Sequence, residues 1–345
     1  MNRKNETMNI AIIGNWGHHV CVLEETDLVP EARVVGLAPG IEGEDLGSLQ
    51  KAYPDAVTFG DHHAMLAESR PDVILISTRL DRIAPLAIDT ANAGLHSICE
   101  KPLALTHENL RALWDAVVAN RTQCLAMLSS RKQSVLAAAK ALVESGRIGT
   151  VQLLNARKSY KCPDAPTGWL GRRETYGGTI PWVGIHALDF IAFAAGSPFR
   201  SVSAFHANVA HPLQPGREDI CTMNLQLANG ALATASIDYL RPQSAPSHGD
   251  DWLRIVGTEG SVEAAMERNS LTVFDADGVH EITEFAPRAP YFPDLIRSMP
   301  KPGSAGPTAE TRQSFALTHT ALCARDAADT CQTINDLRGP WDDLH

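Results

Sequence analysis

Long basic runs, paired cysteine motifs and extended apolar stretches are all missing from this chain. The net charge is −10 and the isoelectric point is about 5.7. No basic run exceeds Arg131-Lys132 or Arg172-Arg173. Such a surface does not attract phosphate backbones, so we do not expect nucleic-acid binding.

The cysteines also exclude a disulfide framework. Seven are present, and they are scattered and odd in number. This usage is typical of reduced, mostly structural thiols in a cytoplasm. Residues 1–8 are polar and the first apolar run, residues 10–13, is too short for a signal-peptide core or a membrane span. We therefore expect a cytoplasmic protein without a membrane partner.

The first third of the chain alternates short apolar runs with helical patterns. Strands are predicted at residues 9–14, 33–38, 73–78 and 96–99, and helices around residues 20–28, 62–68, 83–93 and 108–119. Gly94 ends one helix and Thr106 is the expected cap of the next. This order predicts βαβ units and a doubly wound parallel sheet. We assign residues 1–128 to this Rossmann-type domain.

The rest of the chain predicts an α/β domain with a large, mostly antiparallel sheet, over residues 129–345. Residues 221–227 and 231–239 alternate around Asn229-Gly230, which predicts a hairpin. Further strands are expected at 151–160, 252–256 and 271–274, helices at 134–145 and 308–330, and a long proline-rich loop at 285–307. One face of the hairpin carries few charges, so we expect a homo-oligomer that forms through this sheet.

The segment Cys99-Glu100-Lys101-Pro102 follows a predicted buried strand. In an open parallel sheet, ligands bind at the carboxyl edge of the strands. Glu100 and Lys101 are therefore candidate site residues, although a lysine in a surface turn is the simpler alternative.

A second candidate is the turn that follows the first strand, where a dinucleotide fold places its pyrophosphate loop. Gly14 fills the first glycine position, Trp16 crowds the second, and Gly17 is displaced. An ordinary strand–helix turn remains the alternative. The second strand ends at Pro39, where a dinucleotide fold usually has an acid that binds the adenosine ribose. The candidate cofactor-binding residues are Gly14, Asn15, Trp16, Gly17, His18, Pro39, Ser77, Thr78, Glu100 and Lys101.

The choice between the two nicotinamide dinucleotides rests on the acids that follow Pro39. Glu42, Glu44 and Asp45 would repel a 2′-phosphate, which favours NAD over NADP, if they do not simply form an acidic solvated loop.

A glycine-rich segment precedes a predicted helix that carries His186 and Asp189. Residues three apart share a helix face, so the carboxylate could orient the imidazole; a polar helix start is the alternative. The candidate substrate-binding residues are Tyr160, Lys161, Trp169, Arg172, Tyr176, Trp182 and His186. The pairs His18-His19 and His62-His63 should point apart on their helices, so we expect no metal site.

Taken in order along the chain, several motifs resemble the Gfo/Idh/MocA family, the relatives of glucose–fructose oxidoreductase and inositol dehydrogenase. They are Gly14 after a strand, Cys99-Glu-Lys-Pro102, Ser145-Gly-Arg-Ile-Gly149, Gly184-Ile-His186-Ala-Leu-Asp189 and Gly257-Thr-Glu-Gly260. The resemblance implies a Rossmann domain, a second α/β domain with an open sheet, and hydride transfer between NAD(P) and a sugar, inositol or related polyol. It also implies that Lys101 and His186 are catalytic. The family often carries D-x-G-x-H, and here Trp182 replaces the Asp.

The leading hypothesis is thus an NAD(P)-dependent oxidoreductase. His186 would be the general base, Asp189 would orient it, and Lys101 would hydrogen-bond the reacting oxygen. Trp16 and Trp182 favour one alternative, a dinucleotide- or sugar-binding regulatory protein without turnover. A further alternative is an enzyme that uses tightly bound NAD for elimination or hydrolysis.

Overall fold

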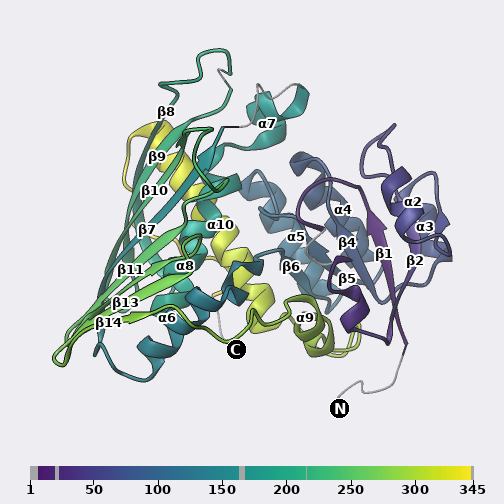
Figure 1. The fold of residues 1–345 in the computed structure, drawn as a ribbon. Helices are drawn as coiled ribbons and strands as arrows, with labels where there is room; N and C mark the ends of the chain where they lie inside the picture. Colours follow the sequence, from purple (N-terminus) through teal and green to yellow (C-terminus); the bar gives the residue numbers. More distant parts are fainter. Residues whose placement is uncertain (1–6, 20–22, 163–167, 215, 343–345) are drawn as a thin grey trace.

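Two sheets with helices packed around them make up the structure, a computed structural model that describes residues 7–19, 23–162, 168–214 and 216–342 (Figure 1). The helix expected at residues 20–28 lies partly outside the described residues. Within its described part, Thr26–Leu28 forms the short 3₁₀ helix η1.

The first sheet has the strand order β3-β2-β1-β4-β5-β6. Its strands are β1 (Met8–Ile13), β2 (Ala32–Ala38), β3 (Val57–Thr58), β4 (Val73–Ile76), β5 (His96–Cys99) and β6 (Cys124–Ala126). Every pair is parallel, which confirms the doubly wound sheet. The order reverses between β1 and β4, and ligands of such sheets bind at this switch point.

Helices cover both faces of this sheet, as its buried strands require. They include α2 (Gly47–Ala52), α3 (His62–Glu68), α4 (Leu80–Asn92) and α5 (His107–Ala119). The hydroxyl of Thr106 accepts a hydrogen bond from the Asn109 amide, which confirms Thr106 as the cap of α5. The short strands β3 and β6 were not expected from the sequence, because two or three residues are too few to show a period.

The second sheet has eight strands in the order β14-β13-β12-β11-β7-β10-β9-β8. They are β7 (Val151–Lys161), β8 (Phe199–Ala207), β9 (Ile220–Leu227), β10 (Leu232–Arg241), β11 (Trp252–Gly257), β12 (Ser261–Ala265), β13 (Ser270–Asp275) and β14 (Gly278–Ile282). Only β7 and β10 pair in parallel. The β9–β10 hairpin is confirmed, and Gly230 in its turn has a φ of +90°.

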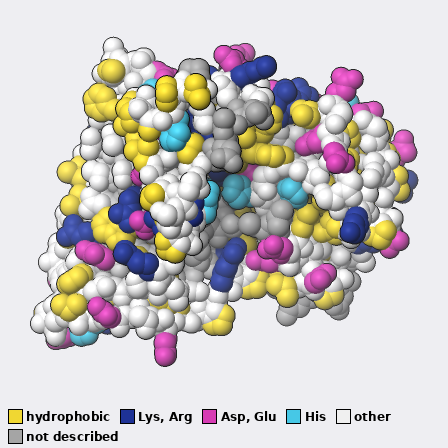
Figure 2. Space-filling view, turned by 45° about the horizontal axis from the view of Figure 1, so that its top comes forward, with side chains coloured by type: hydrophobic (Ala, Val, Ile, Leu, Met, Phe, Trp, Pro, Cys, Tyr) yellow, Lys and Arg dark blue, Asp and Glu magenta, His cyan; other side chains and the backbone are white. Residues whose placement is uncertain are grey.

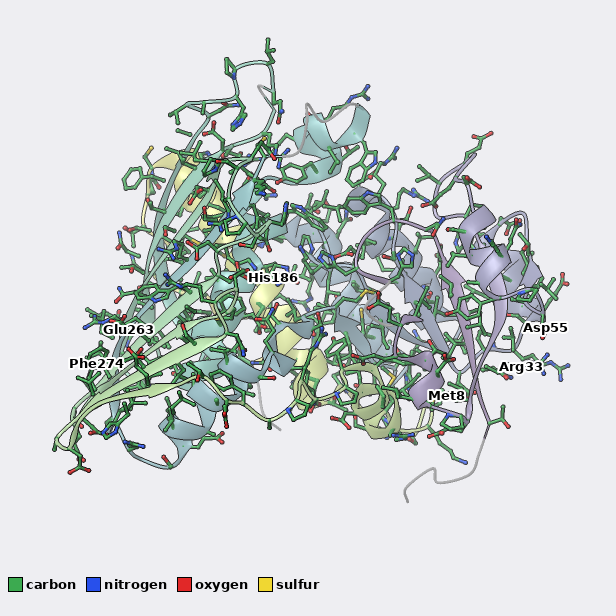
Figure 3. The ribbon with its side chains drawn as sticks, in the orientation of Figure 1. Met8, Arg33, Asp55, His186, Glu263 and Phe274 are labelled. Atoms are coloured by element: carbon green, nitrogen blue, oxygen red, sulfur yellow. The ribbon has the colours of Figure 1, made fainter. Side chains whose placement is uncertain are left out.

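One face of the second sheet is buried under helices and the other is open. The helices α6 (Ser134–Glu144), α8 (Ile185–Ala195) and α10 (Ala309–Thr330) lie on the side toward the first sheet (Figure 1). Met223 and Ile237 point into this core, whereas Thr222 and Thr234 are exposed on the other face. Glu263 and Phe274 lie on the far side of the sheet from the helices (Figure 3).

The segment 285–307 is not entirely a loop, because α9 (Phe292–Ser298) lies inside it. Pro293 occupies the first turn, where its missing amide hydrogen costs nothing, so proline here starts a helix instead of breaking one. Phe292 and Ile296 pack in one buried cluster with Ile10 and Ile12 of β1. The chain thus returns to the first sheet after it completes the second.

One described stretch, Arg173–Ala195, is long and apolar enough to cross a membrane, and most of it is buried inside the protein. It contains α7 (Arg173–Tyr176), the π-helical turn η4 (Ile180–Gly184) and α8. A mostly buried segment of this kind is typical of a core helix.

Candidate active site

A cavity of about 300 Å³ lies between the carboxyl edge of the first sheet and the buried face of the second. Figure 2 shows histidine side chains gathered around the hollow between the two halves of the molecule, and Figure 3 places His186 between the two sheets. The residues that line it are Trp16, His18, Lys101, Tyr160, Leu170, Tyr176, Trp182, Val183, His186, Arg217, Tyr239 and His248. Several predicted site residues therefore meet at one place, although they come from distant parts of the chain.

Glu100 lies behind the cavity wall and links the turn after β1 to the end of β5. Its carboxylate is fully buried and accepts hydrogen bonds from the His18 amide at 2.5 Å and from the Lys101 amide at 2.9 Å. The His18 Nδ1 atom lies 2.9 Å from Glu100 Oε2. Burial alone would raise the pKa of Glu100, but His18 and Lys101 lower it below its usual value. Glu100 is thus an anion that fixes the turn after β1 against the end of β5.

Lys101 lies on the cavity wall with its ammonium group removed from water. Its Nζ atom donates a hydrogen bond to the Trp182 carbonyl oxygen at 2.6 Å and lies 3.4 Å from the centroid of the Trp182 ring. Burial lowers the pKa of Lys101 to about 7; Glu100 opposes this shift and Lys158 adds to it. A lysine with such a pKa can gain and lose a proton at neutral pH.

His186 lines the same cavity from the first turn of α8. Burial, together with the charges of Lys101 and Lys158, lowers the pKa of His186 well below 6.5. Its Nδ1 atom is buried and has no hydrogen-bond partner among the described residues. The imidazole is therefore neutral at physiological pH.

The expected pairing of Asp189 with His186 is wrong. Asp189 Oδ1 instead accepts hydrogen bonds from Arg131, including one from Nε at 2.7 Å. Arg131 stands just before α6, and its long side chain outcompetes a histidine one turn away because it offers several fixed donors. Asp189 is completely buried and lies outside the lining of the cavity.

The predicted aromatic wall is present in part. The Trp16 ring packs against Trp169 and Trp182, with centroid distances of 4.5 and 5.2 Å. The Trp16 side chain thus reaches across to the second half of the protein. Tyr160 and Tyr176 also line the cavity.

Three predicted substrate-binding residues are outside the lining of the cavity, and one of them is Trp169, whose ring packs against Trp16. Lys161 follows Tyr160 on β7 and so faces the opposite side of the sheet, where its Nζ atom donates to the Ala245 carbonyl oxygen at 2.6 Å. Arg172 is exposed just before α7. Neither of them lines the cavity.

Sequence reasoning missed Arg217, Tyr239 and His248 in the lining, and Lys158 beneath it. Lys158 and Tyr160 are two residues apart on β7, and Lys158 Nζ lies 4.8 Å from the Tyr160 ring centroid. The alternation of a strand could have revealed this lysine. Burial would lower its pKa, but Tyr160 and an ion pair with Asp251 raise it, so Lys158 carries its charge. Arg217 lies in a loop, and a loop has no periodic pattern from which the direction of its side chains could be predicted.

The turn after β1 has the features of an anion-binding loop. Gly14 has a φ of +84°, and a Cβ atom there would lie 2.5 Å from the Ser77 carbonyl oxygen, so only glycine fits. The Asn15 amide donates to Glu44 Oε1 at 3.0 Å, and the Thr78 hydroxyl lies 3.2 Å from both Glu44 carboxylate oxygens. The first contact places an anionic oxygen on the turn, and the second places one at the neighbouring end of β4. The turn therefore fits the diphosphate of a dinucleotide.

Glu44 also reaches the end of β2. Its Oε2 atom accepts a hydrogen bond from the Gly40 amide at 2.7 Å, one residue after Pro39. The strand thus lacks the expected acid at its end, and a carboxylate a few residues later occupies that corner. This is the corner at which a Rossmann fold binds the adenosine ribose.

The expectation that neighbouring histidines point apart is wrong for one pair. The rings of His62 and His63 lie 3.9 Å apart and both approach Asp89 of α4, at 2.9 and 4.0 Å. A second group, His107, His319 and Cys323, also brings possible metal-ligand atoms within 4.8 Å of one another. Both groups lie outside the cavity that holds Lys101.

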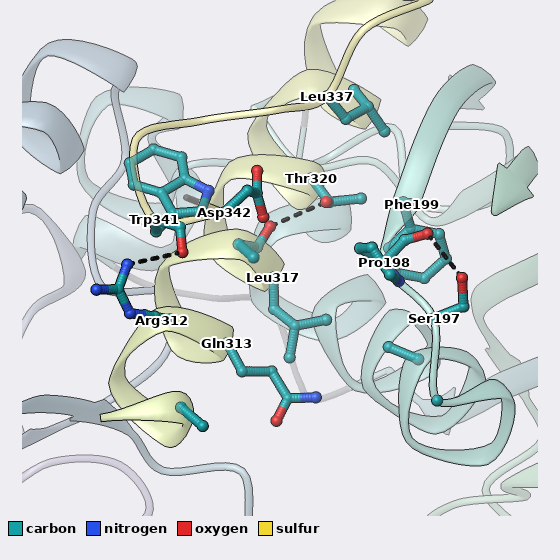
Figure 4. Close-up of a pocket in the computed structure, with 14 residues that line it drawn as sticks. Ser197, Pro198, Phe199, Arg312, Gln313, Leu317, Thr320, Leu337, Trp341 and Asp342 are labelled. Carbon is teal, nitrogen blue, oxygen red and sulfur yellow. Dashed lines mark hydrogen bonds between the residues drawn. The ribbon is translucent and has the colours of Figure 1, made fainter. Parts of the chain in front are cut away.

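A different cavity lies between β8, α8 and α10 (Figure 4). Leu317, Phe199 and Trp341 contribute to its lining, and Arg312 Nη1 donates to the Trp341 carbonyl oxygen at 3.3 Å. The described residues that line it include no lysine or histidine. It therefore does not offer the acid–base groups found beside Trp182.

Comparison with known families agrees with this geometry. Residues 26–128 match the oxidoreductase family with an NAD-binding Rossmann fold, and residues 136–263 match the GFO/IDH/MocA C-terminal domain. Levoglucosan dehydrogenase of Pseudarthrobacter phenanthrenivorans is 29% identical over 239 residues, which is 60% of this chain and 59% of that protein. Inositol 2-dehydrogenase of Rhizobium meliloti is 28% identical over 218 residues, 62% of this chain and 64% of that protein. The match thus spans about three fifths of these curated relatives.

Solved structures match over nearly the whole chain. The structure of a candidate oxidoreductase from Thermotoga maritima is 35% identical with a TM-score of 0.85, over 95% of this chain and 99% of that one. A levoglucosan dehydrogenase complex with NADH and levoglucosan has a TM-score of 0.82 over 97% of this chain and 100% of that one. Its identity is 20%, so this likeness shows the shared fold alone.

Proposed function

Since the chain belongs to the Gfo/Idh/MocA family of oxidoreductases with an NAD-binding Rossmann fold, we propose that it is a dehydrogenase. It would transfer hydride between a nicotinamide dinucleotide and a carbinol of a sugar or polyol. The observation that carries this proposal is that Lys101 and His186 line one cavity beside the switch point of the first sheet.

The dinucleotide would be held by the turn after β1 and by the ends of β2, β4 and β5. The amide of Asn15 binds a carboxylate in the structure, and such an amide would suit a diphosphate equally well. Ser77 and Thr78 stand at the end of β4 beside Gly14. The bound nicotinamide would supply the hydride acceptor or donor.

Lys101 is the better match for the proton acceptor at neutral pH. Its pKa of about 7 lies near the working pH, which favours general-base catalysis. The pKa of His186 is far lower, so its imidazolium would be a strong acid and its neutral ring a weak base. We therefore assign the role of general base to Lys101, whereas the sequence favoured His186 for it. Neutral His186 would donate a hydrogen bond to the reacting oxygen and orient it, and neutral Lys101 would take the hydroxyl proton as the carbinol is oxidised and its hydride leaves to the nicotinamide.

The cofactor is proposed to be NAD rather than NADP. The carboxylate of Glu44 lies at the Gly40 amide, in the corner of the fold that receives the adenosine ribose. A 2′-phosphate there would meet a negative charge, whereas ribose hydroxyls could donate hydrogen bonds to it. This choice rests on the position of Glu44 alone.

Sugars and polyols are the proposed substrate class, because tryptophan and tyrosine rings line a cavity with hydrogen-bonding groups between them. The relatives named above act on levoglucosan and inositol, which are of this class.

We further propose that the protein works as a cytoplasmic homo-oligomer, in which the open face of the second sheet is covered by a second copy. Phe205 and Leu232 on this face are 60% and 54% exposed. Apolar side chains that are this exposed on one sheet face favour a covered surface.

Calorimetric titration of NAD and NADP, followed by nicotinamide absorbance with a panel of sugars, polyols and sugar acids, tests the proposed function. We expect NAD to bind and at least one compound to give substrate-dependent NADH. Failure of both dinucleotides to bind at millimolar concentration contradicts the proposed cofactor. Binding without any reduction would favour a regulatory binding protein, and product formation with no net change in NAD would favour elimination or hydrolysis.

A further inference from the structure

We propose that the substrate is an anionic sugar, a sugar acid whose carboxylate is held by Arg217. The claim that the sugar acid is the substrate rests on the proposed dehydrogenase function. The claim that Arg217 binds its carboxylate does not depend on that function. It concerns the same cavity that holds Lys101 and His186.

Arg217 is a buried cation without a carboxylate partner among the described residues. Its side chain lines the cavity, is 6% exposed, and has an Nε atom that is buried and makes no hydrogen bond. The guanidinium lies 3.8 Å from the Tyr239 ring centroid, and Nη1 reaches Gln214 Oε1 only at 3.4 Å. A buried charge left in this state is costly, so a ligand with a complementary charge would be strongly favoured.

The remaining charges around the cavity also favour an anionic ligand. The described residues that line it include Lys101 and Arg217, but no Asp or Glu. Two acids near the cavity are already engaged, since Glu100 binds the turn at His18 and Asp251 is paired with Lys158. An uncharged sugar would leave Arg217 with only the tyrosine rings and Gln214 beside it, whereas a carboxylate would neutralise its charge.

Trp182 removes the one acid that the family pattern would place here. An Asp at this position would put a negative charge beside Lys101, whose Nζ atom instead lies over the indole ring. Because Trp182 carries no negative charge, it does not repel an anion from the cavity. It therefore fits a change of substrate charge better than a simple loss of activity.

The geometry of the donor favours a carboxylate over a phosphate. A guanidinium presents a planar fork that binds the two oxygens of one carboxylate. Arg217 is the single arginine among the described residues of the lining, and the aromatic rings of Tyr176 and Tyr239 beside it offer little further compensation for a dianion. A monoanionic sugar acid therefore matches the site.

Calorimetric titration of the full chain in the presence of NADH, and again without it, tests this inference. The probes are D-glucuronate and D-galacturonate, each paired with its neutral sugar, D-glucose and D-galactose, together with glucose 6-phosphate. We expect each acid to bind at least roughly 10-fold more tightly than its neutral partner, which corresponds to about 1.4 kcal/mol, because the guanidinium can form a charge-assisted bidentate contact with the carboxylate. The variant Arg217→Met should lose this preference, and Arg217→Lys should retain part of it.

Arg33→Met is the matched control, because Arg33 is an exposed arginine at the other end of the molecule (Figure 3). It should keep the preference for acids, and thermal melting of each variant verifies that it is folded. The inference is overturned if neutral sugars bind as well as the acids, if no acid binds at millimolar concentration, or if glucose 6-phosphate binds more tightly than the acids.

The two proposals can fail separately. An Arg217-dependent preference for acids without any NADH formation would refute the dehydrogenase but leave the anion site intact. Turnover of neutral sugars that Arg217→Met does not reduce would leave the dehydrogenase intact and refute the anion site.

Discussion

The ammonium group of Lys101 lies over the indole ring of Trp182, 3.4 Å from the ring centroid, and donates a hydrogen bond to the carbonyl oxygen of the same residue. Lys101 lies two residues beyond the end of β5 in the first sheet, and Trp182 lies in the π-helical turn that leads into α8. The contact therefore joins the two halves of the protein at the cavity. Burial of the amine at this place, together with the charge of Lys158, keeps the pKa of Lys101 low.

The first prediction concerns pH. With Lys101 as proton acceptor, kcat/KM for carbinol oxidation should rise as the pH rises through about 7, since the neutral amine is the active form. The reverse reduction should depend on the protonated amine and fall over the same interval. Initial rates from pH 5.5 to 9 would show the inflection, and Lys101→Met should remove it. A wild-type profile that is flat around pH 7 would assign the proton to another group.

A second prediction is that Trp182→Asp moves this inflection upward. The new carboxylate would stabilise the charged form of Lys101, which the indole ring does less strongly. The same change should weaken the binding of sugar acids, because it adds a negative charge to the cavity. The control Trp169→Phe keeps an aromatic ring against Trp16 and adds no charge. An unchanged pH profile in Trp182→Asp would show that position 182 does not set the proton affinity of Lys101.

The third prediction is that Glu44→Gln weakens the choice of NAD over NADP. Neutral Gln removes the repulsion of a 2′-phosphate, and we expect the ratio of the two affinities to shift by roughly 10-fold, which corresponds to about 1.4 kcal/mol. Glu42→Gln is the control, because Glu42 is exposed and lies two residues away. Calorimetry with both dinucleotides measures the ratio. If the two variants behave alike, Glu44 does not select the cofactor.

A fourth prediction addresses the open sheet face. Light scattering at micromolar concentration should find an oligomer, and Leu232→Lys should shift it toward the monomer, since it buries a charge in the proposed contact. Val57→Lys changes a side chain of similar exposure, 57%, on the first sheet and should leave the assembly intact. A wild-type protein that is monomeric under these conditions would refute the contact.

The sequence predicted the fold well because the fold depends on periodic patterns. The apolar run of β4 and the alternation around Asn229-Gly230 identified the parallel sheet and the hairpin. The prediction failed for α9, where a proline that starts a helix was read as part of a loop. Prolines at the first turn and within a loop are alike unless the neighbouring contacts are known.

The acid–base residues of the site were predicted because each follows from a strand end or a helix start. Lys101 and His186 are of this kind, and both line the cavity. Asp189 was assigned from its spacing, and no local pattern indicates that Arg131, which is 58 positions away, binds it. Arg217 was missed because it belongs to a loop, whose side-chain directions no local pattern determines.

The central claim is that Lys101 and His186 perform the chemistry of one site without being required to hold the dinucleotide. The direct test compares turnover, from nicotinamide absorbance, with dinucleotide affinity, from calorimetry, for Lys101→Met, His186→Ala and the wild type. We predict that each variant lowers kcat by roughly 10²-fold or more, as the removal of an acid–base or orienting group does, while the Kd for the dinucleotide changes little. If both variants turn over a confirmed substrate at nearly the wild-type rate, the chemistry lies elsewhere.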